Sequence, residues 1–198
     1  MPRGRPRNFD RDIALERAME VFWEKGYESA QLIDLTTAMG INPPSFYAAF
    51  GCKETAFREA LALYQRKLGA AWSGALKSGI DTRQSIQSLL DYSIELALSA
   101  PGPGGCMMVM SMINATPSSQ ALTDLLRQRR REACHQFRER LHRGVREGDL
   151  PSSTDVERLA TFYWAVLQAI SLQARDGASR KELDDIAVSA MMAMPDAA

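Results

Sequence analysis

Apolar residues recur at helical spacing along almost the whole of this chain, and no segment alternates apolar and polar side chains as a half-buried β-strand does. Residues 10–25, for example, place four apolar side chains on one helical face: Ala14, Ala18, Val21 and Phe22. Glycine or proline follows most of the periodic segments, as is common where helices end. The pattern therefore predicts an all-α fold.

About nine helices are expected. In chain order, they cover residues 10–25, 32–39, 44–50, 53 toward 72, 86–97, 106–113, 119–146, 154–175 and 179–194. A chain of 198 residues with 45% hydrophobic residues can bury a sizeable core. The grouping of short and long helices predicts an N-terminal arm over residues 1–9, a three-helix head over 10–52 and a larger helical bundle over 53–198.

The charge of the chain is informative through its distribution rather than its sum. Twenty-four basic and 24 acidic residues give a formal net charge of zero. Arg3, Arg5 and Arg7, however, precede any acidic residue and form a basic arm. Eight further arginines lie in residues 127–146, where salt bridges with neighbouring acidic residues are the expected arrangement.

The expected compartment is the cytoplasm. Residues 2–12 are polar and lack the apolar core of a signal peptide. No apolar run approaches the roughly 20 residues that span a bilayer, so no membrane partner is expected. The three cysteines are widely spaced and contain no CxxC, which disfavours a disulfide framework or a zinc ribbon.

Residues 32–50 have the pattern of a helix-turn-helix. Gly40 stands where the chain must turn sharply, a position that often requires the left-handed conformation. Asn42 is a suitable N-cap for the second helix, and proline is tolerated in the first turn that follows. Phe46 and Phe50 then face the core, which leaves Tyr47 outward. Such a pair can set its second helix in the major groove of DNA, and the alternative is two core helices joined by an ordinary glycine turn.

The sequence resembles the TetR/AcrR family of bacterial transcriptional regulators. The residues that carry the resemblance are Gly4–Arg7, Ala18–Tyr27, Asp34–Thr36, Met39–Asn42, Pro44–Ser45, Tyr47–Gly51 and Lys53–Glu54. The match is dense over about residues 3 to 66. Beyond that stretch, only the number and lengths of the helices and the Gly105–Cys106 element resemble the family. The resemblance implies a homodimeric repressor with a DNA-binding head and a ligand-binding body.

Carried over residue by residue, the resemblance implies a DNA-contacting surface made of Gln31, Asn42, Pro43, Pro44, Ser45, Tyr47 and Lys53. Most such contacts address phosphates and set the register of the protein on the duplex. Pro43 stands where close relatives often carry an arginine, and alanines follow at positions 48 and 49. Base readout by this helix is therefore expected to be thin. We hypothesise that Arg3, Arg5 and Arg7 enter the minor groove, with a solvated tail as the alternative.

The last two expected helices suggest a dimer interface. Residues 159–170 are apolar almost all round the helix, so both sides of this helix should be covered. A two-fold interface made by this helix and the next one would provide the cover. The expected interface residues are Trp164, Leu167, Leu183, Ile186 and Met191. The alternative is a helix buried in the core of a monomer.

A ligand pocket is expected among the middle helices. Its candidate lining is Trp72, Leu89, Tyr92, Cys106, Met107, Met110, Phe137, Phe162 and Tyr163. Flexible thioethers suit a cavity for a small apolar or amphipathic effector, although methionines at helical spacing are more often ordinary core packing.

Cys106 follows a Pro-Gly-rich segment and opens a helix, where the helix dipole favours a thiolate. A thiol that senses electrophiles or oxidants is one interpretation, and a small buried hydrophobic residue is the other. His135, Glu139 and His142 share one helical face, but the arginines around them favour a solvated basic face over a metal site. No metal or other cofactor is expected.

The sequence predicts a ligand-responsive repressor that binds a palindromic operator as a homodimer. No phosphate-binding glycine loop or Ser-His-Asp arrangement supports an enzyme. Two alternatives remain open: a redox- or electrophile-sensing regulator that acts through Cys106, and a helical interaction protein without specific DNA readout.

Overall fold

The computed structural model describes residues 9–77, 81–100, 102, 104–111 and 116–196. Over these ranges it contains nine α-helices, one 3₁₀ helix and no strand, which confirms the predicted all-α class. In chain order the elements are α1 (Arg11–Ser29), α2 (Leu32–Met39), α3 (Pro43–Phe50), α4 (Lys53–Lys77), α5 (Thr82–Ser99), α6 (Met107–Met110), η1 (Pro117–Ser119), α7 (Gln120–Glu147), α8 (Val156–Arg175) and α9 (Arg180–Met191).

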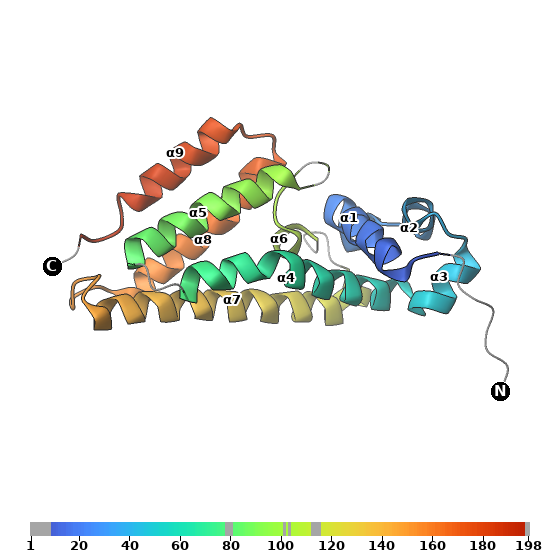
Figure 1. The fold of residues 1–198 in the computed structure, drawn as a ribbon, viewed down its shortest axis with the longest axis horizontal. Helices are drawn as coiled ribbons and strands as arrows, with labels where there is room; N and C mark the ends of the chain where they lie inside the picture. The colour runs from blue at the N-terminus through green and yellow to red at the C-terminus, as the bar shows by residue number, and fades with distance from the viewer. Residues whose placement is uncertain (1–8, 78–80, 101, 103, 112–115, 197–198) are drawn as a thin grey trace.

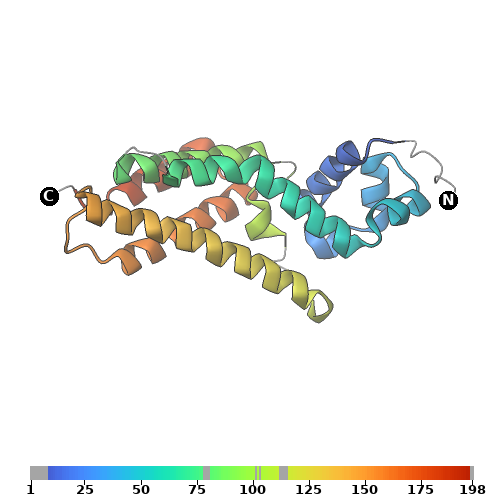
Figure 2. The same cartoon turned by 60° about the horizontal axis from the view of Figure 1, so that its bottom comes forward.

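The molecule is elongated, with α1, α2 and α3 gathered at one end (Figure 1). We call these three helices the head and the remaining elements the body. The long helices α4 and α7 run along the length of the body, and α4 continues as far as the head (Figures 1 and 2). Helices α5 and α8 pack beside α4 and α7, and α9 packs on α5 and α8 to complete the body. The predicted domain boundary between residues 52 and 53 coincides with the short connection from α3 to α4 and stays a prediction.

Helix α1 begins and breaks where local chemistry requires it. The Asp10 carboxylate accepts the N–H groups of Asp12 at 2.9 Å and Ile13 at 3.2 Å, which caps the first turn. At Gly26 the backbone takes φ 75° and ψ 172°, and a kinked last turn then continues to Ser29. A Cβ atom at Gly26 would lie 3.2 Å from the carbonyl oxygen of Ser111 in the body. Glycine is therefore required both for the positive φ and for this close approach.

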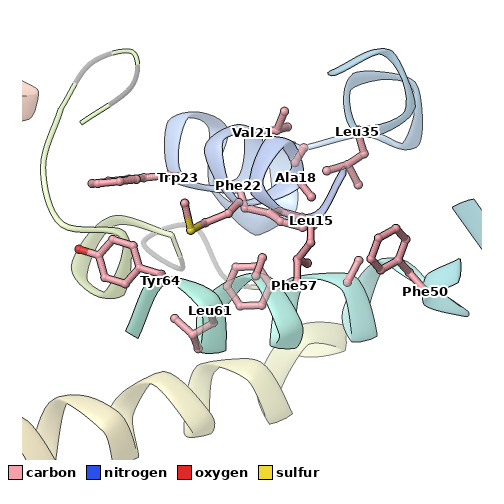
Figure 3. Close-up of a cluster of buried hydrophobic side chains, with 14 of the residues drawn as sticks. Leu15, Ala18, Val21, Phe22, Trp23, Leu35, Phe50, Phe57, Leu61 and Tyr64 are labelled. Atoms are coloured by element: carbon pink, nitrogen blue, oxygen red, sulfur yellow. The ribbon is translucent and has the colours of Figure 1, made fainter. Parts of the chain in front are cut away.

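A first hydrophobic cluster joins the head to α4. Phe22 is fully buried and meets the ring of Phe57 edge-on at 5.1 Å between centroids. Leu15 and Leu35 pack into the same cluster, as Figure 3 shows. Fully burying a side chain of this size contributes about 1.5–3 kcal/mol. The head is therefore held on α4 by a continuous core.

A second cluster holds the body together. It buries residues of α5, α7, α8 and α9, including Phe137, Tyr163 and Leu183. The Tyr163 hydroxyl donates to the carbonyl oxygen of Ala190 at 2.9 Å and so joins α8 to α9. No helix in the described part of the chain is long and apolar enough to cross a membrane.

A buried arginine connects α7 to the start of α5. Arg140 is only 2% exposed, and its guanidinium donates to Ser85 Oγ at 3.1 Å and to Thr82 Oγ1 at 2.6 Å. Asp149 lies 3.4 Å from the same guanidinium and accepts the backbone N–H of Thr82 at 2.8 Å. At Gly144 a Cβ atom would stand 2.1 Å from Thr82 Oγ1, so glycine lets the two helices meet. This cluster is the main polar connection between α5 and α7.

Several predicted helices end at other residues than expected; α1 and α4, for example, continue to Ser29 and Lys77, beyond the expected 25 and 72. The helix expected over residues 106–113 is confined to Met107–Met110, and residues 112–115 lie outside the described part. The helix expected over 86–97 is longer, because Asp81 caps it by accepting the N–H of Gln84 at 2.8 Å.

Candidate DNA-binding head and ligand cavity

The helix pair α2–α3 has the geometry expected from its sequence. Gly40 adopts φ 66° and ψ 32°, the left-handed conformation that ends α2. Asn42 Oδ1 accepts the N–H of Ser45 at 2.9 Å, and Pro43 occupies the first turn of α3. Phe46 and Phe50 are buried, whereas Tyr47 is 52% exposed. Helix α3 is thus anchored on one face and presents the other face to solvent.

Most of the predicted DNA-contacting residues are exposed on α3 or at the start of α2 and α3. Gln31, Asn42, Pro43, Pro44 and Tyr47 are exposed, and Ser45 is partly exposed. Lys53 differs, because its ammonium donates to the Glu28 carbonyl oxygen at 3.3 Å and lies 4.5 Å from the centre of the Tyr27 ring. Burial lowers the pKa of Lys53. Its predicted phosphate contact would require the side chain to turn outward. Arg3, Arg5 and Arg7 lie outside the described residues.

Two side chains that sequence reasoning missed hold the head in shape. Arg11 donates to both carboxylate oxygens of Glu59, at 2.8 and 2.6 Å, and to the Ala49 carbonyl oxygen at 3.3 Å. It therefore connects α1, the end of α3 and α4. The Asp34 carboxylate accepts the N–H of Gln31, the N-cap of α2, at 2.8 Å. The first turn of α2 is therefore capped.

A set of hydrogen bonds joins the end of α1 to the body on either side of α6. The Trp23 indole N–H donates to the Gly105 carbonyl oxygen at 2.6 Å, and the Tyr27 N–H donates to the Ser111 carbonyl oxygen at 2.9 Å. Arg175 at the end of α8 donates to the Glu24 carbonyl oxygen at 3.0 Å. These partners are far apart in sequence, so local patterns could not reveal them. We call these contacts the head–body joint.

Glu28 adds a further link to the head–body joint. Its carboxylate accepts the Thr116 hydroxyl at 2.8 Å and also the Ser119 hydroxyl. The hydrogen bond from Ser119 is the main reason why the pKa of Glu28 lies below its usual value. Because the carboxylate is ionised at neutral pH, η1 stays attached to the head.

The body contains a cavity of about 430 Å³ between α4, α5, α6, α7 and α8. Its lining residues are Tyr64, Gln65, Arg66, Leu68, Gly69, Ala70, Trp72, Ser73, Tyr92, Ser93, Leu96, Cys106, Met108, Val109, Arg129, Arg130, Glu132, Ala133, Gln136, Trp164, Leu167, Gln168 and Ser171. The volume suits a small organic molecule.

Three residues of the predicted lining border this cavity: Trp72, Tyr92 and Cys106. Six other predicted residues do not line this cavity. Leu89, Met107, Phe137 and Tyr163 are buried in the two hydrophobic clusters, Met110 is also buried, and Phe162 is 40% exposed beside a second hollow near Pro151. The apolar faces of these helices were assigned correctly, but a core face and a cavity face have the same composition. On α6 it is Met108 and Val109 that reach the cavity.

The predicted dimer residues are also placed differently. Trp164 and Leu167 line the cavity, Leu183 and Met191 are buried in the body core, and Ile186 packs against that core. The large apolar side chains that α8 and α9 expose are instead Phe162, Leu172, Val188 and Met192. Helix α8 packs against its own body with one face, and apolar side chains on its other face are exposed to solvent.

One end of the cavity carries a thiol and two phenols. Cys106 Sγ lies 3.2 Å from the Tyr64 hydroxyl, and the Cys106 N–H donates to Ser171 Oγ at 3.0 Å. The Tyr92 hydroxyl donates to the Leu68 carbonyl oxygen at 2.5 Å. Burial, with the nearby Cys106 as a secondary cause, raises the pKa of Tyr64 well above its usual value. Both phenols are therefore neutral hydrogen-bond donors at physiological pH.

The residues that the structure describes contain no group of three or more side chains arranged to hold a metal ion. His142 lies 3.6 Å from Glu157 on the outer side of α7.

The comparisons with known proteins cover both ends of the chain. A pattern described as "Bacterial regulatory proteins, tetR family" matches residues 14–60, and one described as "Tetracyclin repressor-like, C-terminal domain" matches residues 82–188. The HTH-type transcriptional repressor ComR of Escherichia coli (strain K12) is 34% identical over 198 residues, which is 98% of this chain and 93% of ComR. The HTH-type transcriptional repressor BdcR of the same organism is 24% identical over 91% of this chain and 86% of BdcR.

A solved structure is similar over nearly the whole length. It is a cysteine-substituted form of the TetR family transcriptional regulator CifR, complexed with 26bp double-strand operator DNA. The two proteins share 46% sequence identity with a TM-score of 0.92, over 97% of this chain and 100% of the CifR chain. This chain belongs to the TetR family of bacterial regulatory proteins.

Proposed function

We propose that this protein is a transcriptional repressor that binds a palindromic operator as a homodimer and releases it when a small molecule enters the cavity. The observation that carries the proposal is the outward face of α3, where Tyr47 is exposed while Phe46 and Phe50 anchor the helix. A short helix held in this way can dock rigidly in a major groove. The names of ComR and BdcR as repressors, and the CifR complex with operator DNA, support the assignment.

The exposed apolar face of α8 and α9 supports the homodimer. Phe162 and Leu172 are on α8, Val188 on α9 is 62% exposed, and Met192, directly after the end of α9, is 84% exposed. Helices α8 and α9 are in contact, and exposed large apolar side chains on neighbouring helices favour an interaction site. Pairing this face with a second copy would cover it and would place two heads for two half-sites, about 34 Å apart on DNA.

The head–body joint suggests how the cavity controls the head. Cys106, Met108 and Val109 form one wall of the cavity, and the residues that flank this wall, Gly105 and Ser111, accept hydrogen bonds from α1. A ligand that displaces α6 would therefore move α1, and the head with it. Ligand binding selects the displaced arrangement, in which the two heads no longer match successive grooves.

A fluorescence anisotropy titration tests the proposed function. Duplexes from the DNA upstream of the protein's own gene are compared with shuffled duplexes at two salt concentrations. A repressor is expected to prefer its operator by about 10³-fold or more and to lose affinity steeply as the salt concentration rises. Equal affinity for both duplexes would identify a nonspecific binder, and no binding would favour the helical interaction protein.

If removal of residues 1–7 leaves operator discrimination unchanged, the proposed minor-groove role of the arm is wrong.

The position of Cys106 favours a second candidate, a regulator that responds to electrophiles. Its thiol lines the cavity, and the hydroxyl of Tyr64 lies within hydrogen-bond distance of the sulfur. An electrophile held there would be attacked by sulfur while a phenol stabilised the developing oxyanion. With N-ethylmaleimide as the probe, the S–C bond forms at one alkene carbon and a proton is taken up at the other, so no group leaves.

Testing this candidate requires removal of the competing thiols. Cys52 is exposed, and hydrogen bonds from Thr55 lower its pKa, whereas burial raises the pKa of Cys134. A protein with Cys52→Ser and Cys134→Ser retains only Cys106. In this protein, N-ethylmaleimide is expected to abolish operator binding, with one adduct per chain by mass spectrometry. If a Cys106→Ser variant of the same background releases the operator to the same extent, thiol sensing through Cys106 is excluded.

A further inference from the structure

The charge that lines the cavity is unbalanced. Three guanidinium groups reach it, Arg66 from α4 and Arg129 and Arg130 from α7, whereas Glu132 is the only carboxylate among the lining residues. Glu132 is already occupied, because it accepts from Arg129 at 3.1 Å and from Gln128 at 2.9 Å. The cavity therefore carries a net positive charge.

Arg66 is exposed to water and Arg129 is paired with Glu132, whereas Arg130 is partly buried and has no carboxylate partner among the described residues. Its guanidinium donates to the Met108 carbonyl oxygen at 2.7 Å, and among the described residues no carboxylate lies within ion-pair distance of it. The side chain is partly buried, and this burial, followed by repulsion from Arg127, lowers the pKa of Arg130. A cation that is withdrawn from water and lacks a counter-ion is costly, so the site favours a ligand that supplies one.

The other arginines of α7 show that this arrangement is specific to the cavity. On the outer surface, Arg127 pairs with Asp124 and Arg138 pairs with Glu157 at 2.8 Å. Arg131 and Arg146 are exposed to water. The outer arginines are thus paired with carboxylates or exposed to solvent, as the sequence suggested. Arg130, by contrast, is only partly exposed to solvent and has no carboxylate partner among the described residues.

The rest of the cavity suits an apolar body. Trp72 and Trp164 meet edge-to-face at 6.3 Å between ring centroids, and Leu96 and Leu167 complete the wall. The indole N–H of Trp72 is buried without a hydrogen-bond partner among the described residues and can serve as a further donor. A ligand with an aromatic or aliphatic body would bury that body here.

We infer that the effector is an amphipathic oxyanion, a carboxylate or sulfonate joined to an apolar ring or chain. The anionic group pairs with Arg130, assisted by Arg129 and Arg66, and the apolar part lies against the tryptophans. Arginine holds such groups through two parallel N–H···O hydrogen bonds. The inference rests on the proposed function only in treating the cavity as the effector site.

Two dyes that differ in one charged group provide the test. The anionic dye 8-anilinonaphthalene-1-sulfonate and its neutral analogue N-phenyl-1-naphthylamine share the same ring system. The Kd of each is measured by fluorescence for the wild type, Arg130→Gln, Arg138→Gln and Gly69→Leu. Gly69 lines the cavity, and a Cβ there would meet no atom within 4 Å, so a leucine side chain at this position begins in open space and takes up cavity volume.

Arg130→Gln is expected to weaken binding of the anionic dye by about tenfold or more, since an ion pair of this kind contributes 1.5 kcal/mol or more, and to leave the neutral dye nearly unchanged. The outer-surface control Arg138→Gln should change neither dye, and Gly69→Leu should weaken both. The inference is overturned if Arg130→Gln leaves the anionic dye unaffected or weakens both dyes equally. If Gly69→Leu weakens neither dye, binding occurs outside the cavity and the inference also fails.

Operator release is measured separately with the anionic dye. Dye binding does not depend on DNA, so the anion site and the proposed function can fail independently. If Arg130→Gln weakens only the anionic dye but this dye does not release the operator from the wild-type protein, the anion site is confirmed and the proposed regulation is wrong. A thermal melt of each variant confirms that the dye reports on folded protein, because this dye also binds partly unfolded chains.

Discussion

Replacing Tyr47 by alanine is expected to weaken operator binding by about 30-fold or more, because each good contact to DNA contributes roughly 1–3 kcal/mol and the dimer loses two of them. The side chain is 52% exposed on the outward face of α3. It contacts the protein through an edge-on packing against Phe46 at 5.6 Å. Losing that contact should cost about 0.5–1.5 kcal/mol of stability, so the variant stays folded.

Anisotropy titrations with operator and shuffled duplexes measure this effect. Tyr47→Phe separates the hydroxyl from the ring and should give an intermediate loss if the phenol contacts a phosphate. Leu98→Ala serves as the control, because it removes a similarly exposed apolar side chain from α5 in the body. Operator affinity within twofold of the wild type for Tyr47→Ala would show that α3 is not the recognition helix.

The second large effect is expected on stability, from replacing Arg140 by methionine. The substitution leaves the Asp149 carboxylate and the Thr82 hydroxyl without their cationic partner in a buried cluster. Removal of one partner from a buried ion pair costs about 3–5 kcal/mol. Urea unfolding followed by circular dichroism measures the free energy of unfolding. Arg158→Met is the control, since Arg158 is 85% exposed and lies 3.9 Å from Asp155. An exposed pair of this kind contributes about 0–1 kcal/mol, so equal losses for the two variants would contradict the assigned role.

The same cluster predicts an acid dependence of stability. Burial alone would raise the pKa of Asp149, but hydrogen bonds from Thr82 and the contact with Arg140 outweigh burial and lower it. Because the folded-state pKa lies below the unfolded value of 3.8, the contribution is complete above that pH and is lost as the pH falls further. Arg140→Met should make the free energy of unfolding less dependent on pH in this acid range.

Local chemistry made the head predictable. Gly40, Asn42 and the pair Phe46 and Phe50 each act within a few residues of their own position, through a left-handed turn, a cap and a helical face. The structure bears out these features because nothing distant competes with them. By contrast, the joint between Trp23 and Gly105 connects residues 82 positions apart, and no periodic pattern carries that information.

The cavity and the dimer face were harder to predict for a physical reason. Helical periodicity shows which side of a helix is apolar, but an apolar side can meet the core, a cavity or a second chain. On α6 the core takes Met107 and Met110, and the cavity takes Met108. On α8 the cavity takes Trp164 and Leu167, which the sequence assigned to the dimer.

The sequence alone determined the all-α class, the position of the helix-turn-helix and the family resemblance. Each of these depends on short-range spacing and local backbone preference. Tertiary structure decided which arginine of α7 is enclosed with a carboxylate and which faces the cavity without one. Both arginines lie on the same arginine-rich helix, but α5 places Ser85 and Thr82 against Arg140, whereas Met108 of α6 meets Arg130. Electrostatic free energy depends on that surrounding geometry, and sequence spacing does not encode it.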